Sequence, residues 1–213
     1  MSLQVTEEVV TIQGTGHLIG VVQYFVRLAG CSLKSCPIRH ACDEARSFSH
    51  NAGTATTVAA VVSRAVDAVG VGGWLHVTGG EPTEAPGFEH LVRAANGAGL
   101  RVHIQTSGVR AIEAPFDWLT VSPKVPLGQL RQRYGSELAV VYQGQTDAEL
   151  LELVDRLAFW YAYLVPLTVD GAPYNAAAAE EAVVRLNLQG SREHHNGRRW
   201  LLGIQAHRVW GCP

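Results

Sequence analysis

Three of the four cysteines stand close together on the chain, as Cys31, Cys36 and Cys42. They follow an apolar run at residues 24–29 and a glycine at position 30. Three thiolates that leave a strand on one loop can hold one face of a metal centre. Structural zinc usually takes four ligands, and His40 is available as the fourth, whereas an iron–sulfur cluster can leave one iron open for a substrate. The cysteines alone keep both kinds of metal site open.

A second motif, GGEP at residues 79–82, follows a short apolar run at 74–77. Its two glycines let a ligand approach the backbone closely, and Pro82 fixes the turn. Glu81 would either bind a cationic amine or support the turn itself. A plain connection between a strand and a helix is the alternative interpretation. The motif begins 37 residues after Cys42, with a helix and a strand expected in between, and this order makes it more specific.

The rest of the pattern predicts how these motifs are positioned. Strands are expected at residues 5–12, 21–29, 74–77, 101–105, 117–121, 138–142, 160–165 and 200–205, and helices at 54–69, 88–98, 147–157 and 175–188. Strands that alternate with helices or long connections imply a mainly parallel sheet. We therefore expect an α/β fold, an open partial (β/α) barrel with about six parallel strands and few helices. Residues 1–213 would form a single domain with its site at the carboxyl ends of the strands.

Composition limits the classes of partner. Lysine and arginine total 17 against 19 acids, a net charge of −2, so we expect no nucleic-acid partner. The first residues carry acids where a secretory signal carries bases, and no run approaches the roughly 20 apolar residues of a membrane span. We expect a cytoplasmic protein without a membrane partner, in which thiols stay reduced and clustered cysteines bind metal. Cys212 stands apart and is interpreted as a spare thiol.

The cysteine loop followed by GGEP resembles the radical S-adenosylmethionine superfamily. More narrowly, the chain is similar to the 7-carboxy-7-deazaguanine synthase family. This resemblance rests on TIQGTG at 11–16, FVRLAGC at 25–31, CDE at 42–44, TGGEP at 78–82, QTSG at 105–108, VSPK at 121–124, SELAVV at 136–141, LVPL at 164–167 and IQAHRVWGCP at 204–213. It implies a lyase that converts 6-carboxy-5,6,7,8-tetrahydropterin to 7-carboxy-7-deazaguanine with loss of ammonia, as in queuosine-type 7-deazapurine biosynthesis.

The resemblance also implies cofactors and their ligands. A [4Fe-4S] cluster on the three cysteines would reduce S-adenosylmethionine bound at its open iron. The S-adenosylmethionine site would comprise Gly80, Glu81, Ser107, Ser122 and Lys124. The substrate site would comprise Gln13, Thr15, Arg27, Thr78, His207 and Pro213.

Two of these side chains have a physical case of their own. Lys124 is a cation at the end of a strand and suits a carboxylate, with a surface lysine as the alternative. Arg27 lies in an apolar strand, where a guanidinium needs an anionic partner. That partner is either the substrate or a buried structural ion pair.

Three positions depart from the family pattern. The cysteine spacing is C-x4-C-x5-C, where the family usually has three residues and then two. Glu44 replaces a threonine that helps to bind Mg²⁺, so Glu44 would bind Mg²⁺ itself, replace the role of the metal or face solvent. Thr15 replaces an acid, which weakens recognition of the guanidine-like edge of a pterin.

Two alternatives follow from these departures. One is a radical S-adenosylmethionine enzyme of the same scaffold that acts on a related heterocycle or activates a partner protein. The other is a zinc-binding module without catalysis. The resemblance further implies a homodimer and a flavodoxin- or ferredoxin-type electron donor.

Overall fold

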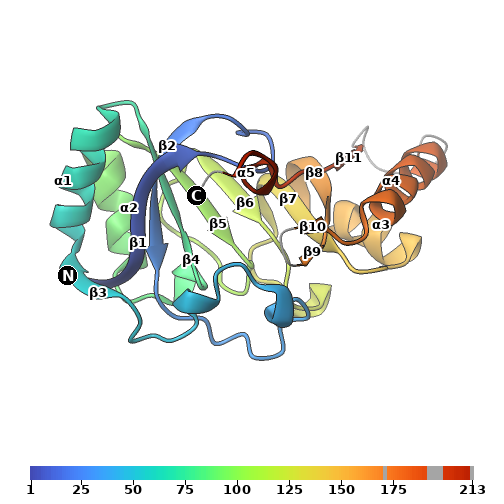
Figure 1. The fold of residues 1–213 in the computed structure, drawn as a ribbon, viewed down its shortest axis with the longest axis horizontal. Coiled ribbons are helices and arrows are strands. Elements are labelled where there is room, and N and C mark those ends of the chain that lie inside the picture. The colour runs from blue at the N-terminus through green and yellow to red at the C-terminus, as the bar shows by residue number, and fades with distance from the viewer. Residues whose placement is uncertain (170–171, 191–198, 212–213) are drawn as a thin grey trace.

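The computed structural model describes residues 1–169, 172–190 and 199–211 (Figure 1). Its main element is a nine-stranded sheet in the order β11-β8-β7-β6-β5-β4-β2-β1-β3. Seven strands are mutually parallel: β2 (Val22–Leu28), β4 (Trp74–Gly79), β5 (Arg101–Thr106), β6 (Trp118–Val121), β7 (Tyr134–Tyr142), β8 (Ala158–Pro166) and β11 (Trp200–Leu202). Two strands, β1 (Ser2–Ile12) and β3 (Thr54–Thr57), extend the sheet in antiparallel fashion.

The predicted α/β class with a mostly parallel sheet is confirmed. The order of strands leaves β3 and β11 as the two edges, and within the described residues these edges do not pair to close a barrel. The partial-barrel geometry with about six parallel strands stays a prediction.

Helices cover the two ends of the sheet. Figure 1 shows α1 (Val58–Val69) and α2 (Phe88–Gly97) together at one end, with α3 (Asp147–Arg156) and α4 (Ala176–Gly190) at the other. Helix α1 forms because its apolar residues recur on one face, and Val58, Val61 and Ala65 are buried there. A capping box between Thr146 and Glu149 starts α3. Among the described residues, no helix combines the length and the apolar character needed to cross a bilayer.

Three features differ from the sequence prediction. The helix expected from Thr54 begins at Val58, because residues 54–57 form β3 and pair with β1, and the Thr57 side chain then caps α1 by accepting a hydrogen bond from Ala60 N. The strand expected to reach Gln205 ends at Leu202. A short helix, α5 (Ala206–Trp210), follows, and its first nitrogen donates to Gly14 O at 2.7 Å. A small hairpin, β9 (Thr168–Val169) with β10 (Ala172–Pro173), was not predicted.

The two faces of the parallel sheet differ in chemistry. Leu75, Val77, Val102 and Ile104 belong to the apolar core and are fully buried. The alternate positions carry buried polar residues, Gln23, His76, His103, Thr120 and Glu137. The His103 ring contacts Gln23 Oε1 at 3.1 Å and Thr120 Oγ1 at 2.9 Å, and Thr120 donates to Glu137 at 2.7 Å. A connected polar layer therefore runs across one face of the sheet.

Candidate active site

One pocket lies at the carboxyl ends of β2, β4, β5 and β6, where the sequence predicted the site. Every predicted site residue whose side chain the structure describes lines it: Gln13, Thr15, Arg27, Cys31, Cys36, Cys42, Glu44, Thr78, Gly80, Glu81, Ser107, Ser122 and Lys124. His207 belongs to α5, but its side chain lies outside the described residues, as do Pro213 and Cys212. These residues come together because parallel strands end at one edge of a sheet.

The two ends of the cysteine loop lie side by side and are joined by main-chain hydrogen bonds. Gly30 N donates to Ser47 O at 2.8 Å, and Cys31 N donates to Phe48 O at 3.1 Å. Two single-turn helices, Arg39–Ala41 and Ala45–Ser47, lie between these contacts. The loop is thus closed at its base by main-chain hydrogen bonds.

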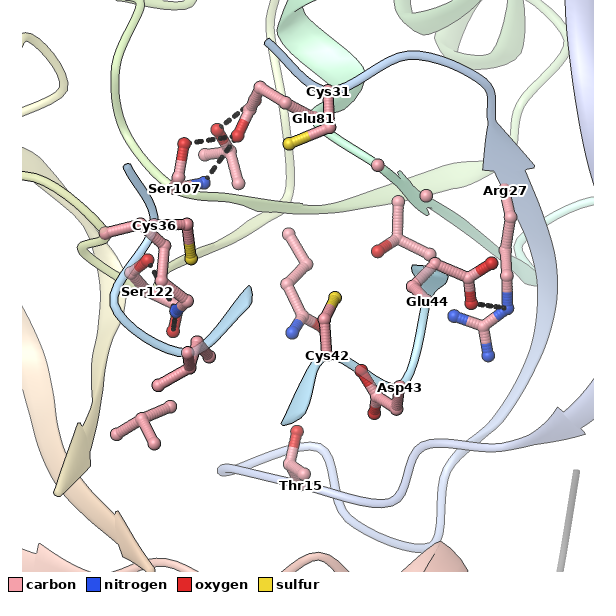
Figure 2. A pocket seen from close by; sticks show the side chains of 18 of the residues that line it. Thr15, Arg27, Cys31, Cys36, Cys42, Asp43, Glu44, Glu81, Ser107 and Ser122 are labelled. Atoms are coloured by element: carbon pink, nitrogen blue, oxygen red, sulfur yellow. Dashed lines mark hydrogen bonds and ion pairs between the residues drawn. The ribbon is translucent and has the colours of Figure 1, made fainter. Parts of the chain in front are cut away.

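Figure 2 shows the thiols of Cys31, Cys36 and Cys42 facing a common space in the pocket. Burial raises the pKa of the thiols of both Cys31 and Cys42. Among the described residues, no three His, Cys, Asp or Glu side chains are grouped closely enough to hold a single metal ion. His40 is exposed and does not line the pocket. Among the described residues, His40 is therefore not placed to complete a four-ligand zinc site with the three thiols.

The GGEP turn is fastened to the base of this loop. Gly80 N donates to Leu28 O at 3.0 Å, and Glu81 N donates to Gly30 O at 2.7 Å. A Cβ atom on Gly80 would lie 2.3 Å from Gly30 O and 2.6 Å from Ser47 O. Only glycine allows the two backbones to approach this closely.

Glu81 supports the turn through its carboxylate, which is almost completely buried. It accepts hydrogen bonds from Thr83 N and Oγ1, from Thr106 Oγ1 at 2.6 Å, and from Ser107 N at 2.8 Å and Ser107 Oγ. Of the two roles considered for Glu81, support of the turn is the one that this geometry displays. The contacts also fix the end of β5 against the turn.

Lys124 lines the pocket on the side of the cysteines. Its Nζ donates to Ser122 O at 3.0 Å and to Ser122 Oγ. Burial lowers the pKa of Lys124, while the nearby Cys36 and Cys42 oppose this shift. The only other lysine, Lys34, is exposed. Lys124 is therefore a partly buried lysine of the pocket rather than a surface lysine.

Arg27 lines the pocket and forms ion pairs within the protein, whereas a substrate partner for it stays a prediction. Its Nε lies 2.6 Å from Glu7 Oε2 and 3.2 Å from Glu44 Oε2. Glu44 is buried, so the idea that it faces solvent is wrong. Figure 2 shows Arg27 and Glu44 joined at one side of the pocket, away from Cys36.

The hairpin loop between β1 and β2 supplies a further wall. Gln13 is buried, and its Nε2 donates to Thr15 Oγ1 at 3.2 Å. The sequence prediction missed several lining residues: Ile12, Phe25, Asp43, Gln105, Thr106, Val141 and Gln205. Gln105 and Thr106 end β5 within the quoted QTSG motif, and that position was a usable signal. Gln205 lines the pocket and accepts a hydrogen bond from Thr168.

The fold and the pocket define an α/β protein with a thiol-rich site at the carboxyl edge of a parallel sheet. The chain is 31% identical over 232 aligned positions to 7-carboxy-7-deazaguanine synthase from Bordetella pertussis, with 100% of both chains covered. It is 30% identical to the synthase from Bacteroides thetaiotaomicron, with 98% of both chains covered. The synthase from Synechocystis is 28% identical over 99% of this chain and 94% of that relative.

The chain belongs to the 7-carboxy-7-deazaguanine synthase family, which is a family of enzymes. Its fold is similar to the crystal structure of QueE from Escherichia coli, with a TM-score of 0.70 over 97% of this chain and 95% of that chain, at 21% identity. No family model matches the sequence.

Proposed function

We propose that this chain is a radical S-adenosylmethionine lyase that converts 6-carboxy-5,6,7,8-tetrahydropterin to 7-carboxy-7-deazaguanine and releases ammonia. The observation that carries the proposal is the sharing of one pocket by two groups of side chains. Three thiols and Lys124 form one group, and Gln13 and Arg27 belong to the other. The full-length relatives with this activity in their names support the same assignment.

Cys31, Cys36 and Cys42 would hold a [4Fe-4S] cluster, and the pocket would bind S-adenosylmethionine beside it. Together these groups supply the one-electron chemistry that removes a hydrogen atom from the substrate. Lys124 and Ser122 suit the carboxylate of S-adenosylmethionine, because Lys124 is a partly buried lysine of the pocket. Gly80, Glu81 and Ser107 line the pocket where its amine would bind, and the Glu81 carboxylate keeps that turn in place.

Arg27 would hold the carboxylate of the pterin. The printed contacts of Glu7 and Glu44 are with its Nε, and its two terminal nitrogens would make a two-point contact with the substrate carboxylate. Thr78 lies beside Arg27 in the parallel register of β2 and β4 and would contact the same end of the substrate. Gln13 and Thr15, with His207 and Pro213, would bind the ring end.

In catalysis the protein would otherwise position the substrate and exclude water from the pocket. Phe25, Ile12 and Val141 add apolar surface to the pocket, which strengthens the polar contacts made inside it. Because no acid stands at position 15, the ring end is recognised by neutral donors and acceptors of Gln13 and Thr15.

We also propose one domain for residues 1–213, since one apolar cluster includes residues from β1 through β11. Free thiols at a metal site fit a reducing compartment, so we place the protein in the cytoplasm. On the resemblance to the family we further propose a role in queuosine-type biosynthesis, a homodimer and a flavodoxin- or ferredoxin-type electron donor.

The first test is the iron, sulfide and zinc content of anaerobically purified protein. We expect about four irons and four sulfides per chain and an EPR signal that S-adenosylmethionine alters. Cys36→Ala should lose the cluster, whereas Cys212→Ala should keep it. If the protein contains zinc but no sulfide after anaerobic reconstitution, the alternative of a zinc-binding module without catalysis is favoured instead.

Incubation with 6-carboxy-5,6,7,8-tetrahydropterin and product analysis by mass spectrometry form the second test. We expect 7-carboxy-7-deazaguanine and ammonia in equal amounts. A loaded cluster that cleaves S-adenosylmethionine but leaves this pterin unchanged would favour a related heterocycle or a partner protein as the substrate.

A further inference from the structure

Four charged side chains form a closed ring of ion pairs at the edge of the pocket. Arg27 Nε contacts Glu7 Oε2 at 2.6 Å and Glu44 Oε2 at 3.2 Å. Arg46 closes the ring, with Nη2 at 2.7 Å from Glu7 Oε2 and Nε at 2.9 Å from Glu44 Oε1. Two cations and two anions alternate, so the ring is neutral. It connects β1, β2 and the cysteine loop.

The residues around Glu44 do not fit the Mg²⁺ that the family resemblance implies. One carboxylate oxygen of Glu44 accepts hydrogen bonds from Arg46 Nε and from Ser47 Oγ at 2.7 Å, and the other faces Arg27 Nε. Mg²⁺ needs an octahedron of oxygen ligands at about 2.0–2.1 Å. A guanidinium against each oxygen blocks that approach and repels a second cation.

The pKa values agree with this picture of a saturated ring. Burial alone would raise the pKa of Glu7, but hydrogen bonds and charges from Arg27 and Arg46 lower it. The hydrogen bond to Glu44 raises the pKa of Arg46. Each of the two carboxylates therefore already lies between two guanidinium groups of the protein.

We propose that this ring takes the place of the divalent cation, so that the chain works without Mg²⁺. This inference rests on the proposed function for the identity of the substrate. Arg27 is the cation that meets the substrate carboxylate, and Figure 2 shows its guanidinium reaching toward the pocket beside Glu44. Glu7, Glu44 and Arg46 are positioning residues, because each acts by holding Arg27 or its partner. Glu44 is the least exposed of the four side chains, at 10%.

Metal binding tests the proposal directly. Cluster-loaded protein in its EPR-silent oxidised state is titrated with Mn²⁺, with and without the carboxy-tetrahydropterin, and free Mn²⁺ is followed by EPR. We expect no Mn²⁺ bound at micromolar concentration, and equal turnover in metal-depleted buffer and in millimolar Mg²⁺. Micromolar Mn²⁺ binding that Glu44→Gln abolishes would overturn the proposal, whatever the turnover does. If the pterin is not turned over at all, the proposed function fails. The Mn²⁺ titration of the protein without pterin still decides whether the chain binds a divalent cation.

A charge-removing variant tests the positioning role. Glu44→Gln keeps the size of the side chain but frees Arg27, so we expect KM for the pterin to rise about ten-fold with kcat within about two-fold. Glu8→Gln is the matched control, because Glu8 is the next residue on β1 and pairs with Arg64 of α1 outside the pocket. It should change neither constant.

Arg46→Gln is a second test in case Glu44→Gln fails to fold. Arg46 is half-exposed, and without it the buried Glu44 carboxylate still pairs with Arg27. A smaller rise in KM, about three-fold, is expected. An unchanged KM in both variants would overturn the role of the ring.

Discussion

The main-chain nitrogen of Glu81 donates to the carbonyl oxygen of Gly30 at 2.7 Å and so joins the GGEP turn to the base of the cysteine loop. The same close approach leaves no room for a side chain at position 80. In Gly80→Ala, the new Cβ would overlap the carbonyls of Gly30 and Ser47. We expect a loss of about 2 kcal/mol in the free energy of unfolding and reduced iron incorporation. Urea denaturation and iron analysis check both.

Gly97→Ala is the control for this substitution. Gly97 ends α2, and nothing lies within 4 Å of its added Cβ. It should leave iron content unchanged and raise stability by up to about 1 kcal/mol. Equal stability of Gly80→Ala and wild type would show that the two backbones can separate freely.

Glu81→Gln should destabilise the turn although it is nearly isosteric. The carboxylate accepts from five donors on Thr83, Thr106 and Ser107, and an amide NH₂ would face some of them with no acceptor. A buried unsatisfied donor of this kind costs about 2–3 kcal/mol. Urea unfolding measures the loss, and Glu152→Gln on the exposed face of α3 should stay within about 0.5 kcal/mol of wild type.

Lys124→Ala should weaken binding of S-adenosylmethionine. The ammonium is held toward Ser122 in a pocket that removes water from it, so its contact with a carboxylate is strong. We expect the Kd to rise at least about ten-fold. Isothermal titration calorimetry on cluster-loaded protein measures it, and the exposed Lys34→Ala is the control. Identical affinities of the two variants for S-adenosylmethionine would show that Lys124 does not bind it.

Stability should fall as the pH drops below about 6.5. Burial lowers the pKa of His103 to about 3 and that of His76 well below its ordinary value. Below about pH 6.5 the unfolded chain therefore binds protons that the folded chain refuses, and each such histidine costs about 1 kcal/mol per pH unit. Urea unfolding at about pH 7.5 and 5.5 should show the loss.

The variant His103→Gln should lose about 1 kcal/mol less between these two pH values than wild type does. His90→Gln, on the exposed face of α2, should behave as wild type. A His103→Gln slope equal to that of wild type would mean that His103 takes up its proton in the folded state.

The place of the site was predictable because strand ends are visible in sequence, whereas the individual site residues came from the resemblance to a family. The motifs after residues 29, 77, 105 and 121 stand where β2, β4, β5 and β6 stop, and parallel strands place their carboxyl ends at one edge. The core face of α1 was also visible, since Val58, Val61 and Ala65 repeat with the period of a helix.

Long-range pairings were not predictable. Residues 54–57 pair with β1 in an antiparallel register that no local sequence pattern encodes. The sequence pattern therefore predicted them as the start of a helix. The ring around Glu44 depends on the antiparallel register that sets Glu7 opposite Arg27, next to an irregularity between Val5 and Glu7. Likewise, the saturation of Glu81 requires Thr106 and Ser107 from a different strand end. Each of these contacts joins segments that lie far apart in the sequence.

The closed base of the cysteine loop has an evolutionary consequence. Because Gly30 pairs with Ser47 and Cys31 with Phe48, residues can be gained or lost between these contacts without moving the sheet. Each doubling of such a loop costs only about 0.6 kcal/mol of closure entropy. The spacing of Cys36 and Cys42 can therefore drift between lineages while the scaffold is inherited intact. An unusual cysteine spacing in a relative is then a weaker sign of lost chemistry than a change at Gly80.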